Sequence, residues 1–151
     1  MNCSVAQGLE VVGEWWSMLI VRDAFMGVTR FEDFHDRLGI SRNVLNARLN
    51  HLVDRGVFER VAYCEHPPRY DYRLTAKGKD LWAVLTALRQ CGDRWESPAG
   101  APVELIHKGC GQVAEIVEAC SECGERVTGR DVRAVPGPGA TSDSLLPERR
   151  S

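Results

Sequence analysis

The sequence lacks any long apolar run and any recognisable leader. No stretch of its 151 residues approaches the roughly 20 apolar residues of a membrane-spanning helix. The N-terminus has neither the basic nor the apolar region of a signal peptide. Phosphate-binding glycine loops and nucleophile motifs are also missing. We therefore expect a cytoplasmic protein with no membrane partner and no enzymatic activity.

The sequence also has little net charge, but this charge is unevenly distributed. A formal net charge of −2 argues against a protein that coats nucleic acid through overall positive charge. Residues 41–79 nevertheless hold eight Lys or Arg and four Asp or Glu, a net charge of +4, which leaves −6 for the rest of the chain. Positive charge gathered on one segment of a near-neutral protein is typical of a phosphate-binding face.

Apolar periodicity and Pro or Gly punctuation divide the chain into four parts. Helices are predicted before residue 57 and over 75–95, with a hairpin at 57–74. A Pro- and Gly-containing linker, a Cys-rich module and a Pro-rich tail that we expect to be disordered follow. No internal repeat is visible. The predicted fold class is α+β and mostly helical, and the parts span residues 1–96, 97–102, 103–133 and 134–151.

The first helices carry start and stop signals. Residues 15–25 are apolar on nearly every face, so we expect that helix to lie inside the core. Gly27 and Gly39 end helices. Thr29 and Glu32 have the spacing of a capping box, in which each side chain satisfies a backbone donor beside the other.

Two helices joined by the short turn at residues 38–40 predict a helix-turn-helix. The second helix begins at the N-cap Ser41 and runs to Gly56. Arg and Asn gather on the face opposite its leucines, and these side chains match the guanine and adenine edges of the major groove. The alternative is a solvated face of an ordinary bundle helix. The residues expected to contact DNA from this helix are Ser41, Arg42, Asn43, Asn46 and Asn50.

A hairpin directly after such a helix is a wing. Two prolines in its tip, at residues 64–69, prevent further strand pairing. An arginine at the tip suits the minor groove or a phosphate. The alternative is a plain edge hairpin with a solvated arginine. The residues that we expect to contact phosphates or the minor groove are Arg48, Arg69, Arg73 and Lys77.

Five segments, in this order and spacing, resemble the HxlR-type winged helix-turn-helix transcriptional regulators of bacteria, relatives of the MarR group. They are Cys3–Ala6, Gly13–Asp23, Gly27–Phe34, Leu38–Leu45 and Pro67–Gly78. The resemblance implies a homodimer that binds palindromic operators, usually as a repressor and sometimes as an activator. It also implies dimer contacts from the first helix and from the helix after the wing. One departure is Ser4, where Pro is common, and it affects only the first turn.

The helix after the wing supports a dimer independently. Leu81, Leu85 and Leu88 form one apolar stripe, with Trp82 beside it and Trp95 beyond. Such a stripe is long for a helix that covers only one small core, so we expect it to pack against a partner helix. Packing within the chain is the alternative. A two-fold dimer would present two recognition helices to half-sites about one DNA turn apart.

Four ligand-type residues follow the pattern H-x2-C-x9-C-x2-C, which is typical of a zinc ribbon. Cysteines in a chain without an export signal are more often metal ligands or redox thiols than disulfides. Two residues between ligands make a tight turn, and a glycine after each second ligand suits its positive φ. We expect strand-like segments at 103–106 and 113–117 to hold the two turns together. The predicted ligands are His107, Cys110, Cys120 and Cys123.

Four protein ligands leave no open position, so the predicted zinc is structural. A module of about 30 residues cannot bury enough core to fold alone, and we expect the metal to supply the missing stabilisation. Iron is the alternative metal, and free thiols on a loose tail are the alternative to any metal.

Three further cysteines lack partners at ligand spacing. Cys3 precedes the first helix, whose free amides favour a thiolate. Some relatives sense oxidants through a cysteine near this place, although an inert thiol is the alternative. Cys64 lies in the wing, and oxidation there would act on DNA binding directly. We expect Cys91 to pack on a helix face.

Together these features predict a sequence-specific DNA-binding transcriptional regulator that acts as a repressor. The expected partners are double-stranded DNA, a second copy of the chain and a small-molecule effector of unidentified chemistry. One alternative is a thiol- or metal-responsive sensor on the same fold. Another is a protein-interaction adaptor that uses the zinc ribbon.

Overall fold

The computed structural model describes residues 2–141 and residue 144. These residues form two units: Ser4–Leu85, and the residues from Thr86 onward together with residues 2 and 3. The rest of the predicted disordered tail, residues 142–143 and 145–151, lies outside the described residues. No helix in the described part of the chain is long and apolar enough to cross a membrane.

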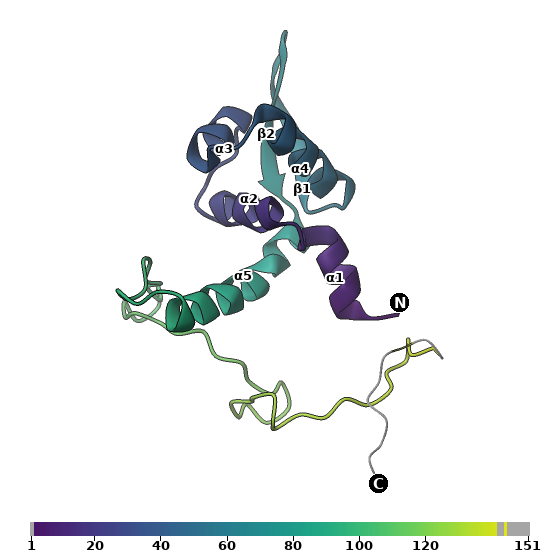
Figure 1. Cartoon of the computed structure of the whole chain (residues 1–151), viewed down its shortest axis with the longest axis vertical. Coiled ribbons are helices and arrows are strands. Elements are labelled where there is room, and N and C mark those ends of the chain that lie inside the picture. Colours follow the sequence, from purple (N-terminus) through teal and green to yellow (C-terminus); the bar gives the residue numbers. More distant parts are fainter. Residues whose placement is uncertain (1, 142–143, 145–151) are drawn as a thin grey trace. The chain divides into compact units, whose positions relative to one another are not determined.

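The element order confirms the predicted mostly helical α+β fold with a helix-turn-helix and a hairpin (Figure 1). Two helices precede the helix-turn-helix, a two-stranded antiparallel sheet follows it, and a long helix comes last. The elements are α1 (Ser4–Val12), α2 (Trp15–Phe25), α3 (Phe31–Leu38), α4 (Arg42–Asp54), β1 (Phe58–Glu65), β2 (Pro68–Leu74) and α5 (Ala76–Trp95).

The core of the first unit lies where α2, α3 and α4 meet the base of the hairpin. The rings of Phe34 and Phe58 meet edge to face, with centroids 6.4 Å apart. The prediction that α2 lies inside the core holds for only part of its surface, because Trp15 is 73% exposed. Only one stripe of α2 enters the core, as helical periodicity allows. The buried apolar residues are Val12, Ile20, Val21, Phe34, Ile40, Leu45, Leu49, Leu52, Val57, Phe58 and Tyr72.

A buried carboxylate ties α2 to α3. Asp23 is fully buried and accepts hydrogen bonds from Arg22 Nε at 2.9 Å and Arg37 Nε at 3.2 Å. A buried charge is stable only with such partners, because burial strips it of water. Both arginine side chains reach it from positions that are partly exposed.

The start of α3 differs from the predicted capping box. Arg30 is the N-cap and makes no side-chain cap hydrogen bond. Thr29 Oγ1 instead donates to Asp71 Oδ1 at 3.3 Å, and its carbonyl accepts from Tyr72 N at 2.7 Å. The capping-box prediction is therefore wrong, because the segment before α3 pairs with β2. This pairing anchors the hairpin to the helix-turn-helix.

The end of the hairpin and the start of α5 contact the chain that follows α4. Phe58 pairs with Leu74 and Glu65 with Pro68, and the register shifts by one residue between Ala62 and Cys64. Thr75 Oγ1 donates to Gly56 O at 2.6 Å. A Cβ on Gly78 would lie 2.3 Å from the carbonyl oxygen of Val57, so this approach of α5 to the chain before β1 requires glycine.

The second unit contains the last ten residues of α5 and no further helix or strand among its described residues. Residues 103–106 and 113–117 are not the strands that the sequence predicted. Isolated bridges pair Ile106 with Val113 and Ala119 with Arg126 instead. Each bridge closes one turn on itself, and neither joins the two turns.

Candidate nucleic-acid interface

The turn before α4 is set by two caps. Gly39 ends α3 in the left-handed conformation at φ 64°, and the Ser41 side chain accepts from Val44 N at 3.3 Å. Both predicted helix boundaries are thus confirmed. Because the leucine face of α4 is fully buried, the opposite face has to meet solvent. Arg42, Asn43 and Asn46 are exposed there, and Asn50 is half-buried.

Arg42 is held by an acid on the preceding helix. Its guanidinium donates to both carboxylate oxygens of Glu32, at 2.8 and 2.5 Å. The hydrogen bond from Arg42 lowers the pKa of Glu32, and the same bond raises the pKa of Arg42. Arg42 also lies 5.7 Å from the ring centre of Phe31. The pair holds Arg42 in place in the free protein.

Asn50 is linked to the hairpin. Arg60, on β1, donates from Nη2 to Asn50 Oδ1 at 2.5 Å. This bond occupies the amide oxygen and leaves the amide nitrogen of Asn50 as a donor. Arg60 is not among the predicted DNA contacts, and its one signal in the sequence is its place among the positive charges of residues 41–79.

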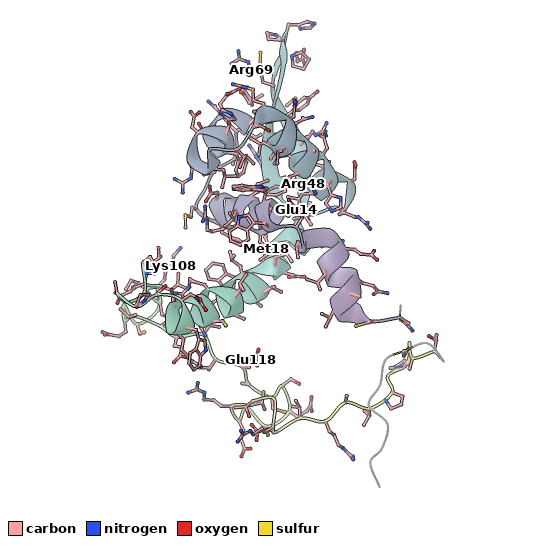
Figure 2. The ribbon with its side chains drawn as sticks, in the orientation of Figure 1. Glu14, Met18, Arg48, Arg69, Lys108 and Glu118 are labelled. Atoms are coloured by element: carbon pink, nitrogen blue, oxygen red, sulfur yellow. The ribbon has the colours of Figure 1, made fainter. Side chains whose placement is uncertain are left out.

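Arg48 lies away from the asparagines. At 100° per residue it is about 200° around α4 from both Asn46 and Asn50. Its Nε lies 3.7 Å from an oxygen of Glu14, whose side chain also accepts from Trp16 N at the start of α2 (Figure 2). The structure does not bring Arg48 onto the face that carries Asn43 and Asn46.

Arg69 lies on the far part of the hairpin and is exposed (Figure 2). Among the described residues it has no ion pair. Arg73 pairs with Asp71 at 3.4 Å, whereas Lys77 Nζ donates to the carbonyl of Arg55 at 2.7 Å. Arg69 is therefore the predicted phosphate contact that is most free to engage DNA.

Arg30 lies on the same surface as Arg69 and is not among the residues that the sequence predicted to contact DNA. Its guanidinium carbon lies 4.7 Å from the ring centre of Tyr63, and its Nε lies 3.8 Å from Asp71 Oδ1. With Arg69 and Tyr70 it lines a pocket of about 600 Å³ between the start of α3 and the hairpin. No sequence signal places residue 30 here, because its pairing with β2 is long-range.

The two cysteine-rich turns, residues 107–111 and 120–124, have the same backbone structure. Gly111 N donates to His107 O at 2.7 Å, and Gly124 N donates to Cys120 O at 2.9 Å. The glycines have φ 71° and 76°, as the sequence predicted. His107 N and Cys120 N each donate to the carbonyl five residues later, at 2.9 Å in both turns.

The equivalence extends beyond the turns. Ala114 N donates to Leu105 O at 2.8 Å, and Val127 N donates to Glu118 O at 3.1 Å. Each of these bonds, like each turn bond and each bridge, has a copy 13 residues further along. The module is thus an internal repeat, contrary to the sequence analysis. The two turns share only Cys and Gly at their last two positions, which hides the repeat in the sequence.

Within each turn the candidate ligands are adjacent. His107 Nδ1 lies 3.3 Å from Cys110 Sγ. In the second turn, backbone amides of Cys123 and Glu122 and the Cys123 side chain hydrogen-bond Cys120 and lower the pKa of its thiol. Residues 2–141 and 144 contain no group of three or more His, Cys, Asp or Glu arranged to hold a metal. The structure therefore brings the four predicted ligands together as two pairs.

The other cysteines are separate from these pairs and, like them, are free thiols. Cys3 is half-buried immediately before α1, as predicted. Cys64 is half-buried in β1, with Sγ 3.6 Å from His66 O. Cys91 is exposed on α5, so the described chain does not itself provide the packing that the sequence predicted.

Comparison with known proteins covers most of the chain. An uncharacterised HTH-type transcriptional regulator of Mycobacterium tuberculosis is 47% identical over 137 residues, which are 90% of this chain and 87% of that protein. The crystal structure of PA1607, named as a candidate transcription factor, matches with a TM-score of 0.80 and 39% identity, over 90% of this chain and 96% of the other. PA1374 of Pseudomonas aeruginosa matches with a TM-score of 0.68 and 40% identity, over 93% and 96%.

These alignments are too long to end with the hairpin and α5, so the similarity reaches into the cysteine-rich module. A family model described as HxlR-like helix-turn-helix matches residues 11–99. The chain therefore belongs to the HxlR-like helix-turn-helix family and is a transcriptional regulator with a helix-turn-helix DNA-binding fold.

Proposed function

We propose that the chain is a homodimeric repressor that contacts a palindromic operator with α4 and the flanking phosphates with the hairpin. The observation that carries this proposal is the exposed face of α4. Its Asn43 and Asn46 side chains project from a helix whose other face is fixed in the core by three fully buried leucines. Asn and Arg make bidentate contacts with adenine and guanine in the major groove.

The hairpin supplies the second contact. Its base is fixed by the pairing of Thr29 with β2, and it projects beyond the helices (Figure 1). Arg69 and Arg30 present positive charge on one side of it. Such arginines suit phosphates or a minor groove beside the half-site. Fixing the wing to α3 gives the two DNA contacts a constant separation.

The dimer is supported by apolar residues that the chain leaves exposed on α5. Leu81 and Leu85 are partly buried, whereas Val84, Leu88 and Trp95 are 52%, 59% and 72% exposed. These three lie at positions i, i+4 and i+11, on one side of the helix. The stripe proposed to meet a partner is therefore offset from the leucine stripe that the sequence indicated. A dimer bound across a promoter would exclude RNA polymerase, which is why we propose repression.

The test is fluorescence anisotropy of the full chain on the duplex upstream of its own gene and on a scrambled duplex, across a salt series. The proposal predicts tight binding to the first duplex only, with affinity that falls steeply as salt rises because phosphate contacts release counterions. In an in vitro transcription assay from that promoter, adding the protein should reduce the amount of transcript. Equal and weak binding to both duplexes would contradict the proposal.

A further inference from the structure

We infer that the two turns of the C-terminal module bind one zinc ion per chain, with His107, Cys110, Cys120 and Cys123 as its four ligands. The backbone of the turns carries the inference. Two segments of different sequence adopt the same closed turn, with every backbone bond repeated 13 residues later. Each turn places its two ligand residues at equivalent positions, so the module holds two matching halves of a four-ligand site.

The two ligand atoms of the first turn lie close to the separation that a shared zinc requires. A tetrahedral zinc with ordinary Zn–N and Zn–S bond lengths places its nitrogen and sulfur ligands about 3.6 Å apart. His107 Nδ1 and Cys110 Sγ lie 3.3 Å apart. The chain makes room for the larger ligand, because a Cβ on Gly109 would lie 2.9 Å from the His107 ring. In the second turn the residue equivalent to Gly109 is Glu122, and the ligand equivalent to His107 is Cys120, which has a smaller side chain.

The described part of the module has no buried core to stabilise it. No residue of 97–141 is buried, although these residues form defined turns. Ile106 and Val113 flank the first turn, and Ile116 and Val117 lie between the turns; all four are 43–58% exposed. An ion is therefore the group that can supply the stabilisation that a module of this size lacks.

The donor set selects the metal. One imidazole and three thiolates suit zinc in a closed tetrahedral site, whereas Mg²⁺ and Ca²⁺ prefer oxygen ligands. Because all four positions are filled by the chain, the ion has no place for water or substrate. The site is structural.

The ion would also act on α5. The Gln90 side chain pairs with the backbone of Ile116, donating to its carbonyl at 2.9 Å and accepting from its amide at 2.8 Å. Arg89 donates to Val103 O at 3.1 Å, and Arg94 lies 3.4 Å from Glu115. Ile116 lies between the turns; in Figure 2 the labelled Lys108 lies in the first turn and the labelled Glu118 lies just before the second. Closing both turns on one ion would fix both ends of the segment that carries these contacts with α5.

The test is the metal content of the full chain, measured by inductively coupled plasma mass spectrometry and by Co²⁺ substitution. The inference predicts one zinc per chain and, with Co²⁺, the absorption of a tetrahedral site with a sulfur-to-cobalt charge-transfer band. Cys110→Ser and Cys123→Ser should each lose most of the zinc. Cys64→Ser removes a thiol outside the turns and should keep one zinc per chain.

Limited trypsin digestion gives a second measurement that needs no DNA. A chelator should speed cleavage at Lys108, Arg126 and Arg130 in the wild type at least tenfold, and should have no effect on the already sensitive Cys123→Ser chain. Absence of zinc from protein purified without chelators would overturn the inference, as would iron in its place or full zinc in Cys123→Ser. Because none of these measurements uses an operator, their failure is distinguishable from failure of the proposed repressor function.

Discussion

Glu32 on α3 holds Arg42, the first residue of α4, through hydrogen bonds of 2.8 and 2.5 Å. The pair joins the two helices of the helix-turn-helix on their solvent side, since both side chains are about 60% exposed. For Arg42 to contact a base or a phosphate, it has to exchange this carboxylate for DNA. The pair therefore opposes DNA binding by a small amount.

Glu32→Gln should strengthen operator binding by up to about fivefold, because an exposed ion pair is weak. The measurement is anisotropy at two salt concentrations. Arg42→Gln should weaken binding, and equal weakening by both variants would show that Glu32 instead positions Arg42. Arg42 lowers the pKa of Glu32. Glu32 therefore becomes protonated, and releases Arg42, only at a pH below the ordinary pKa of glutamate. Affinity between pH 6 and 8 should show no contribution from Glu32 titration.

Gly78→Ala should destabilise the first unit, because its Cβ would lie 2.3 Å from Val57 O in backbone that cannot easily shift. We expect a loss of about 1–3 kcal/mol in the free energy of unfolding by urea. Gly92→Ala, on the same helix, meets no atom within 4 Å and is the matched control. It should stabilise by about 0.5–1 kcal/mol through helix propensity. Equal effects of the two variants would contradict the steric account.

Asp23→Ala should cost about 1–3 kcal/mol of unfolding free energy, since it leaves Arg22 and Arg37 without their buried partner. Asp36→Ala is the control, because the Asp36 side chain is 79% exposed and its ion pair among the described residues is with His35 at 3.4 Å. Its unfolding midpoint should match that of the wild type. A wild-type midpoint for Asp23→Ala would show that the buried carboxylate does not stabilise the α2–α3 contact.

Leu88→Glu should convert the proposed dimer to a monomer, because it places a charge on the exposed stripe of α5. Light scattering after size exclusion measures the mass directly. Glu59→Lys, at an exposed position of β1, changes charge away from that stripe and should remain dimeric. A dimeric Leu88→Glu chain would place the interface elsewhere.

The sequence predicted the features that depend on local chemistry. Helix ends at Gly39 and Ser41 follow from φ preference and N-capping, and the two cysteine turns follow from ligand spacing and glycine. It failed where a distant segment decides the outcome. Thr29 bonds Asp71 rather than Glu32 because β2 reaches the start of α3. No local pattern indicates that pairing.

Two further differences have other causes. Arg48 was assigned to DNA from its charge alone, and the structure places it beside Glu14, away from the asparagine face, so its contact with DNA stays a prediction. The 13-residue repeat was missed because backbone hydrogen bonds, not residue types, are what the two turns share. Residue identity at two positions per turn was too little to reveal it.

The central claim is that the exposed asparagine face of α4 determines which DNA is bound, and Asn46→Ala tests it most directly. Anisotropy should show operator affinity reduced about 10- to 100-fold, the loss of one bidentate base contact, with unchanged affinity for a scrambled duplex. Gln7→Ala, an exposed amide on α1, should bind both duplexes as the wild type does. Wild-type affinity and base preference in Asn46→Ala would contradict the account, because another surface would then have to contact the operator.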